Sequence, residues 1–166
     1  MFLALLVGTA VLLASVLIGS IATAFIVYLV GRLLRSGYAG IGFWKNVAVM
    51  MIVVPVTAAA HLIQITLWAA ALLLVGEFST FENAFYVSAE NYTALGYGDI
   101  VLSERWRLLG PLEAVNGLLL VGLSTAIMFA VLSRLFVNRF REQLGPLGEA
   151  ALNQEPRRSV GGSESQ

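Results

Sequence analysis

The chain has 166 residues, of which 58% are hydrophobic and 12% charged, whereas soluble domains are typically about 45–50% apolar. Ten basic residues balance ten acidic ones, so charge does not indicate a nucleic-acid partner. The chain has no cysteine, which excludes disulfides and thiolate metal sites, and its single histidine excludes a multi-histidine site. We therefore expect an integral membrane protein.

Three apolar stretches are long enough to cross a bilayer, which takes about 20 residues in helical form. Residues 1–31 carry no charge. Residues 46–76 carry only the possible charge of His61, and residues 108–133 carry only that of Glu113. These stretches predict an all-α integral membrane protein with three transmembrane helices.

The first stretch, residues 1–31, predicts a retained helix, because its apolar run exceeds the roughly 7–15 residues of a signal-peptide core. Its small residues, Gly8, Ser15, Gly19 and Ala22, would allow close packing against other helices. The alternative is a helix that faces only lipid.

The polar segments differ in charge and therefore predict an orientation. Residues 32–45 contain three basic residues and no acidic one, whereas residues 77–107 are acidic overall. Basic residues also open the tail, residues 138–166, whose polar composition predicts disorder. By the positive-inside rule, segment 32–45 and the tail are cytoplasmic, and the N-terminus is outside.

Two polar side chains, His61 and Gln64, lie three positions apart within the second stretch and would share one helix face. Polar groups at membrane depth are costly and usually face protein or water. We favour a hydrogen-bonded pair that holds adjacent helices together over a pH-sensitive or gating contact.

Residues 79–82, Ser-Thr-Phe-Glu, fit the capping box that opens a helix. A helix over residues 80–92 would be about 20 Å long, which is too short to span the membrane. Such a re-entrant helix is tolerated where protein buries it. Its C-terminal end carries partial negative charge and would favour a cation at the centre of a pore.

Residues 93–99, Thr-Ala-Leu-Gly-Tyr-Gly-Asp, follow that helix directly. Successive carbonyls of an extended chain point to one side only if alternate residues adopt left-handed backbone angles, which glycine does at low cost. Gly96 and Gly98 have this spacing. A glycine turn in a membrane loop is the alternative, but the position between two long apolar segments favours an ion-selective filter.

The last helix is predicted over residues 104–137. Gly117 and Gly122 within it could each be a gating hinge or a close-packing site. Glu113 and Asn116 would share one face, where hydrogen bonds near the filter are the expected role.

An outer helix at 46–76, a pore helix at 80–92, a filter at 93–99 and an inner helix at 104–137 resemble the pore module of bacterial potassium channels. This resemblance implies a homotetramer, because one chain supplies a quarter of each carbonyl ring, and a bacterial inner membrane. It implies potassium ions as permeant ligands and no other cofactor.

Aligned on Gly-Tyr-Gly-Asp, the chain has Ala94 and Leu95 where the family pattern has threonine and valine. Ala94 lacks the hydroxyl that helps to line the innermost ion site, so we expect that site to be weaker and selectivity to be poorer. The resemblance implies potassium binding by the backbone carbonyls of Ala94, Leu95, Gly96 and Tyr97, flanked by Thr93 and Gly98.

Glu90 falls where some bacterial members carry a glutamate behind the filter, close to the aspartate that is Asp99 here. The resemblance implies that these two carboxyl groups share a proton and brace the filter. Tyr86 and Val87 replace two tryptophans of such members, which implies thinner aromatic support around Tyr97.

The resulting functional prediction is a channel that conducts potassium passively and is selective for it. The alternatives are a weakly selective monovalent cation channel and a non-conducting regulatory or assembly subunit. An enzyme is not expected, because the sequence has no Ser/His/Asp set, metal-ligand cluster or phosphate-binding loop. Other than further copies of the chain, membrane lipid is the only partner expected, with no nucleic acid and no small-molecule substrate.

Overall fold

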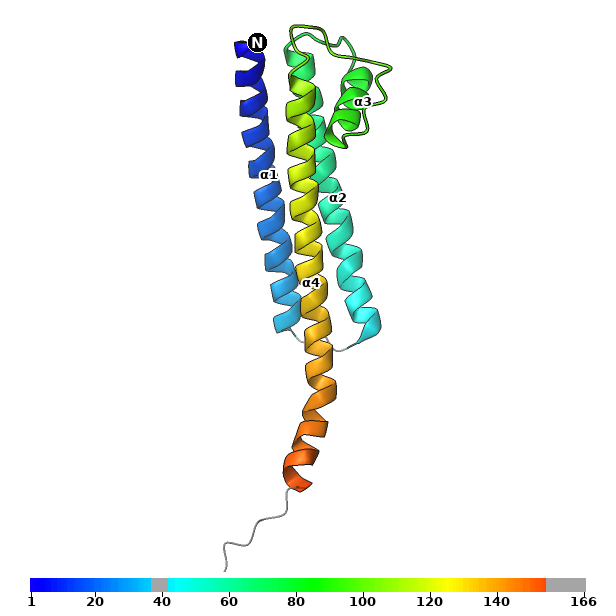
Figure 1. Cartoon of the computed structure of the whole chain (residues 1–166). Coiled ribbons are helices and arrows are strands. Elements are labelled where there is room, and N and C mark those ends of the chain that lie inside the picture. Colours follow the sequence, from blue (N-terminus) through cyan, green and yellow to red (C-terminus); the bar gives the residue numbers. More distant parts are fainter. Residues whose placement is uncertain (37–41, 155–166) are drawn as a thin grey trace, which may run out of the picture.

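The computed structural model describes the backbone of residues 1–36 and 42–154. Within these ranges the chain is helical, with turns and irregular segments but no strand. The helices are α1 (Phe2–Arg35), α2 (Phe43–Leu74), α3 (Phe81–Tyr92) and α4 (Leu109–Gln154). Figure 1 shows α1, α2 and α4 side by side, with the shorter α3 next to them. The predicted all-α fold is confirmed.

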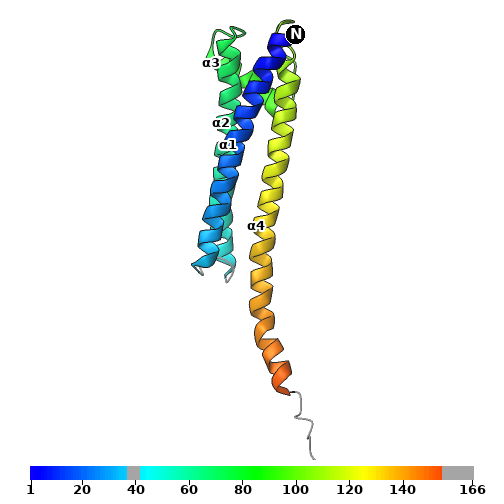
Figure 2. The ribbon, with the colours of Figure 1, turned by 90° about the vertical axis from the view of Figure 1, so that its left-hand side faces the viewer.

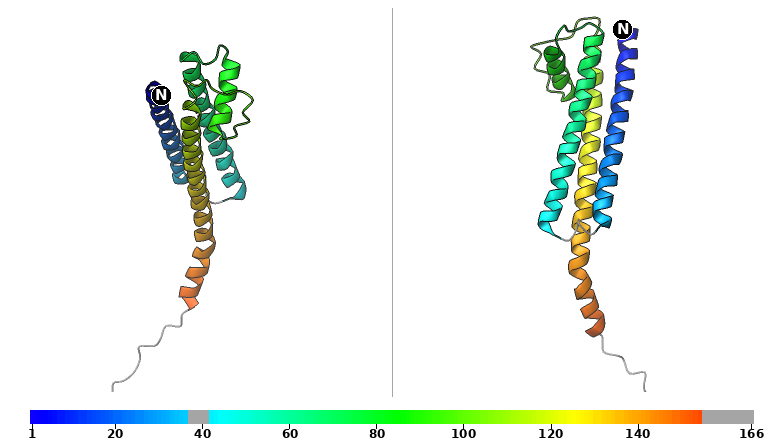
Figure 3. Two further views of the ribbon diagram at one scale, coloured as in Figure 1. Left: turned by 45° about the horizontal axis from the view of Figure 1, so that its top comes forward. Right: turned by 180° about the vertical axis from the view of Figure 1, so that it is seen from behind.

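Three helices are long and apolar enough to cross a membrane, at Phe2–Arg35, Trp44–Leu74 and Leu109–Val137. The prediction of three transmembrane segments is therefore confirmed. Helix α3 has 12 residues and is too short to span a bilayer. The views in Figure 3 place it beside the ends of α2 and α4 that lie nearest the N-terminus. The chain therefore enters the bundle at this end and returns to the same end before α4 begins.

Helix α3 begins one residue later than the expected capping box. Thr80 is the N-cap, with an extended backbone (φ −124°, ψ 143°), and its Oγ1 accepts a hydrogen bond of 3.5 Å from the backbone N–H of Asn83. The expected cap at Ser79 is therefore corrected to Thr80, the residue whose extended conformation suits a cap.

Helix α4 also begins later than expected, at Leu109 rather than within 103–104. A turn precedes it, in which the carbonyl of Ser103 accepts a hydrogen bond of 2.8 Å from the N–H of Arg107. Pro111 falls in the first turn of α4, where its missing N–H leaves no helical bond unmade. The proline therefore fits the start of a new helix.

For residues 138–154, which lie in the C-terminal part of α4, the prediction of a disordered tail over 138–166 is wrong. The helix continues to Gln154, and Figure 2 shows it extending well beyond the ends of α1 and α2. Residues 138–154 are rich in Arg, Glu, Gln, Leu and Ala, which favour helix, and extending an existing helix avoids the cost of nucleation. The described residues do not include 155–166, the rest of the predicted tail. They also do not include 37–41, which lie in the cytoplasmic connection predicted at 32–45.

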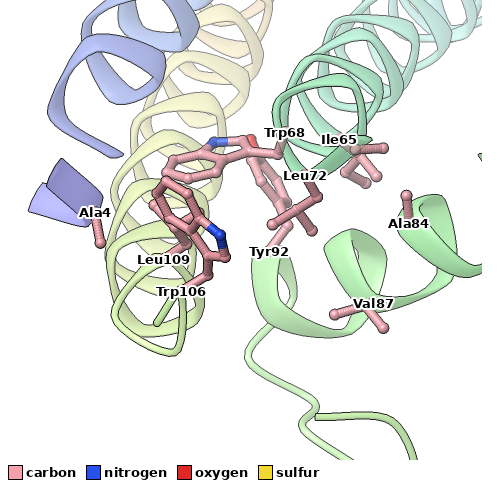
Figure 4. Packing of buried hydrophobic residues seen from close by; sticks show 10 residues of the cluster. Ala4, Ile65, Trp68, Leu72, Ala84, Val87, Tyr92, Trp106 and Leu109 are labelled. Carbon is pink, nitrogen blue, oxygen red and sulfur yellow. The ribbon is translucent and has the colours of Figure 1, made fainter. Parts of the chain in front are cut away.

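Two apolar clusters hold the bundle together. One joins α1, α2, α3 and α4 around Trp68, Tyr92, Trp106 and Leu109, shown in Figure 4. The other joins α1, α2 and α4 nearer the opposite end, with Ile26, Val30, Val49, Val53, Val131 and Leu135. The clusters fix α3 against the bundle at one end and leave the long helices packed on each other at the other end.

The small residues of α1 are sites of close packing against other helices, as predicted, and α1 is not a helix that faces only lipid. A Cβ atom at Gly8 would lie 2.5 Å from Cδ1 of Leu112, and one at Gly19 would lie 3.0 Å from Nε2 of Gln64. Ser15 is fully buried. Helix α1 therefore packs closely on α2 and α4 and does not face lipid alone.

Candidate functional site

The segment after α3 has a backbone of alternating hand. Ala94, Gly96 and Gly98 have φ values of +56°, +57° and +76°, and no other residue between positions 93 and 99 has a positive φ. Left-handed angles were expected at the two glycines, and the structure adds Ala94 to them. The alternation is the geometry that a filter lined by backbone carbonyls requires.

Ala94 is the only residue other than glycine with a positive φ in the described part of the chain. It ends α3: the N–H of Ala94 donates to the carbonyl of Asn91 and the N–H of Leu95 to that of Glu90, both at 2.9 Å. These two bonds form the Schellman motif, in which the left-handed residue is usually glycine. An alanine there costs about 1–2 kcal/mol. The end of α3 and the start of the segment 93–99 are therefore one strained unit.

Every residue from 93 to 99 is exposed in the single chain. The side chains of Leu95 and Tyr97 are 56% and 70% exposed. Irregular backbone at membrane depth is tolerated only when it is buried in protein or lines a water-filled cavity. In a bilayer this segment therefore needs cover that one chain does not provide.

Tyr86 holds the C-terminal end of the segment 93–99. Its hydroxyl donates a hydrogen bond of 3.0 Å to Oδ2 of Asp99. Desolvation, together with the hydrogen bond to Asp99, raises the pKa of Tyr86 to about 12. The phenol therefore stays protonated and remains a donor at physiological pH.

Glu90 and Asp99 do not form the hydrogen-bonded pair that the resemblance implied. Asp99 accepts its hydrogen bond from Tyr86 instead. Glu90 is buried at 5% exposure, and its Oε1 has no hydrogen-bond partner in the described part of the chain. Tyr86, which lies in α3 with Glu90, thus bonds Asp99 in the place where the resemblance implied Glu90.

Glu113 and Asn116 bond different parts of the molecule. The Nδ2 of Asn91, in α3, donates to Oε2 of Glu113 at 3.4 Å. The Nδ2 of Asn116 donates to Oγ of Ser15, in α1, at 2.8 Å. The first bond ties α4 to the last turn of α3, close to the segment 93–99, and the second ties α4 to α1.

His61 and Gln64 form the hydrogen-bonded pair that we favoured. Nδ1 of His61 lies 3.1 Å from Oε1 of Gln64 and 2.9 Å from the hydroxyl of Tyr92, which donates to the same Gln64 oxygen. Nε2 of Gln64 donates to the backbone carbonyl of Ser15 at 3.3 Å. Tyr92 is the last residue of α3 and was not singled out by the sequence analysis. Its position directly before residues 93–99 was the feature of the sequence that could have identified it.

Gly117 allows α4 to approach α3 closely. A Cβ atom there would lie 1.9 Å from the backbone oxygen of Tyr92, whereas one at Gly122 would meet nothing within 4 Å. This geometry favours the close-packing interpretation for Gly117. A hinge role stays a prediction for Gly122.

Glu77 fastens the loop that follows the segment 93–99, a role that was not predicted from the sequence. Its Oε2 accepts a hydrogen bond of 2.8 Å from the hydroxyl of Ser103, and its Oε1 accepts another from the Ser103 N–H. The end of α2 thereby holds the chain that leads from the filter into α4. An acidic residue directly after the glycine that ends an apolar helix was the only signal.

Three spanning helices, with a short helix and an irregular segment folded back between two of them, define a multi-pass membrane protein with a re-entrant loop. A protein-family model described as "Ion channel" matches residues 58–134, from within α2 to within α4. Over these residues the chain is similar to a family of ion channels, whose members move ions and are not enzymes. No curated protein and no solved structure matches the chain.

Proposed function

We propose that the protein is a homotetrameric channel that conducts potassium passively and is selective for it. The observation that carries this proposal is the alternation of positive φ at Ala94, Gly96 and Gly98 inside the matched ion channel domain. Carbonyls turned to one side by this alternation replace the hydration shell of a monovalent cation. The proposed ligands are the backbone oxygens of residues 94–97.

Fourfold assembly is supported by what a single chain leaves exposed. One chain offers one row of carbonyls, which can contact a desolvated ion from one side only. A closed ring of identical chains would surround the ion and would cover Leu95 and Tyr97, both exposed in the single chain. The negative end of the α3 dipole would then face the axis below the filter.

The charge distribution supports an orientation and a location. Three basic residues lie between positions 32 and 45, at the end of the bundle opposite α3. The positive-inside rule then places the filter and the N-terminus outside and the C-terminus in the cytoplasm. We place the channel in a cell membrane, the inner membrane of a bacterium, where lipid surrounds the exposed apolar faces.

The direct test is ion flux through purified protein in liposomes. With potassium inside and sodium outside, we expect a reversal potential near that of potassium, because four carbonyl rings fit the larger, more easily dehydrated ion. Equal permeability would favour a weakly selective cation channel instead, as the missing hydroxyl of Ala94 suggests. Absence of thallium or rubidium flux, or a particle without fourfold symmetry, would overturn the proposal and favour a non-conducting subunit.

Ala94→Thr tests whether this residue lines the innermost ion site. The added hydroxyls would give four more oxygens at that site, so we expect barium to block at about tenfold lower concentration, which corresponds to about 1.4 kcal/mol. Ala94→Gly is the matched control, because it relaxes the left-handed backbone without adding an oxygen. Unchanged block in the threonine variant would show that Ala94 does not line the site.

A further inference from the structure

Helix α1 lies outside the matched ion channel domain, yet buried hydrogen bonds connect it to the filter. It packs against α2 and α4, whereas α3 packs against the same two helices without packing on α1. One side chain of α2, Gln64, forms hydrogen bonds with both α1 and α3. Gln64 is 1% exposed, so its side-chain amide has almost no contact with solvent and depends on hydrogen bonds within the protein.

The two ends of the Gln64 amide bond different helices. Its Nε2 donates to the backbone carbonyl of Ser15 in α1, at 3.3 Å. Its Oε1 accepts a hydrogen bond from the hydroxyl of Tyr92, the last residue of α3. His61 adds a contact of 2.9 Å to that hydroxyl. A buried amide that lost either partner would remain desolvated and unpaired, so the three helices are held in one arrangement.

Tyr92 determines where the filter starts. Its ring is buried at 1% exposure, and Figure 4 shows it reaching from the last turn of α3 toward Trp68 and Leu72 of α2. Its carbonyl oxygen lies against Gly117 of α4. The next residues of the chain, Thr93 and Ala94, form the strained helix end. A shift of Tyr92 therefore moves the first carbonyls of the filter.

We propose that α1 is a positioning element for the filter, acting through Ser15, Gln64 and Tyr92. A second bond, from Asn116 of α4 to Oγ of Ser15 at 2.8 Å, fixes the same point of α1. The effect of this linkage on ion selection rests on the proposed channel function. Its effect on the backbone at residues 93–95 does not.

Two pairs of matched variants test the linkage from its two ends. In α1, Gly19→Ala places a Cβ atom 3.0 Å from Nε2 of Gln64 and 3.0 Å from Cδ2 of Leu120, whereas Gly31→Ala in the same helix meets nothing within 4 Å. Tyr92→Phe, which adds no atom against Leu120, separates the effect on Gln64 from the effect on Leu120. In α3, Tyr92→Phe removes only the hydroxyl that Gln64 and His61 contact. Tyr28→Phe removes a hydroxyl from a residue of α1 that is 58% exposed.

The first readout is hydrogen exchange of the amides of Thr93, Ala94 and Leu95, whose bonds to α3 close the helix end. We expect about fivefold faster exchange in Gly19→Ala and Tyr92→Phe, a factor that corresponds to about one hydrogen bond, and no change in the two controls. Amides near Val30 and Val49, in the other cluster, should exchange as in the wild type, which separates a local shift from general loosening.

The second readout is the permeability of sodium relative to potassium in liposomes, which we expect to rise several-fold in Gly19→Ala and Tyr92→Phe only. Unchanged exchange at residues 93–95 in both variants would overturn the linkage, whatever the protein conducts. Accelerated exchange in a protein whose wild type passes no ions would support the linkage and reject the proposed function. Accelerated exchange with an unaltered permeability ratio in a conducting protein would overturn the effect on selection.

Discussion

Replacing Gly117 with alanine is expected to abolish both tetramer assembly and ion flux. The added Cβ atom would lie 1.9 Å from the backbone oxygen of Tyr92 and 2.7 Å from its carbonyl carbon. The opposing atoms belong to backbone, so no side-chain rotation relieves the overlap, and α3 must move away from α4. We expect a cost of about 3 kcal/mol, the upper end for overpacking, measured by thermal unfolding in detergent.

Gly122→Ala is the matched control, because the same substitution in the same helix meets nothing within 4 Å. It should assemble as the wild type does and unfold at the same or a slightly higher temperature, because alanine inside a helix is about 0.5–1 kcal/mol more favourable than glycine. If Gly122 is a hinge, this variant should form tetramers but open more slowly, since alanine stiffens the helix. Wild-type assembly and flux in Gly117→Ala would contradict the close contact between Tyr92 and α4.

The parts of the fold that follow from local composition were predictable. Long uncharged stretches predicted the three spanning helices, because the bilayer sets their length. Two glycines at a spacing of two predicted left-handed backbone at positions 96 and 98, because few other residues adopt it. Both inferences depend on properties of the residues themselves and not on which distant segment they contact.

The exact helix ends were less predictable. Ser79 and Thr80 are both good caps, and only the conformation of the chain decides that Thr80 has the extended backbone. Ala94 gives no sign of a left-handed conformation, since alanine favours helix interiors. Its conformation follows from the hydrogen bonds that end α3 at this residue.

The polar network required tertiary structure. Gln64 was a candidate from its position at membrane depth, but its partners lie 49 residues before it, at Ser15, and 28 residues after it, at Tyr92. No local pattern relates positions that far apart. Likewise, Tyr86 rather than Glu90 bonds Asp99, because the fold places the hydroxyl of Tyr86, in α3, 3.0 Å from Oδ2 of Asp99.

Gly98→Ala is expected to reduce potassium flux by at least about tenfold, because it strains the filter in every subunit. Gly98 has a φ of +76°, where alanine costs about 1–2 kcal/mol. Relaxation of this strain would rotate the adjoining peptide, whose oxygen belongs to Tyr97 and is a proposed ion ligand. A change of about 1.4 kcal/mol in the barrier to ion movement gives a tenfold change in rate. Rubidium uptake into liposomes measures it.

Gly76→Ala provides a control with nearly the same backbone and surroundings. Gly76 has a φ of +75° at the end of α2, and a Cβ atom at either glycine would meet nothing within 4 Å in the single chain. Both variants should therefore lose about 1–2 kcal/mol of unfolding free energy. Only Gly98→Ala should lose flux, because only its peptide is proposed to contact ions. Equal flux loss in the two variants would assign the effect to stability and remove Gly98 from the conducting path.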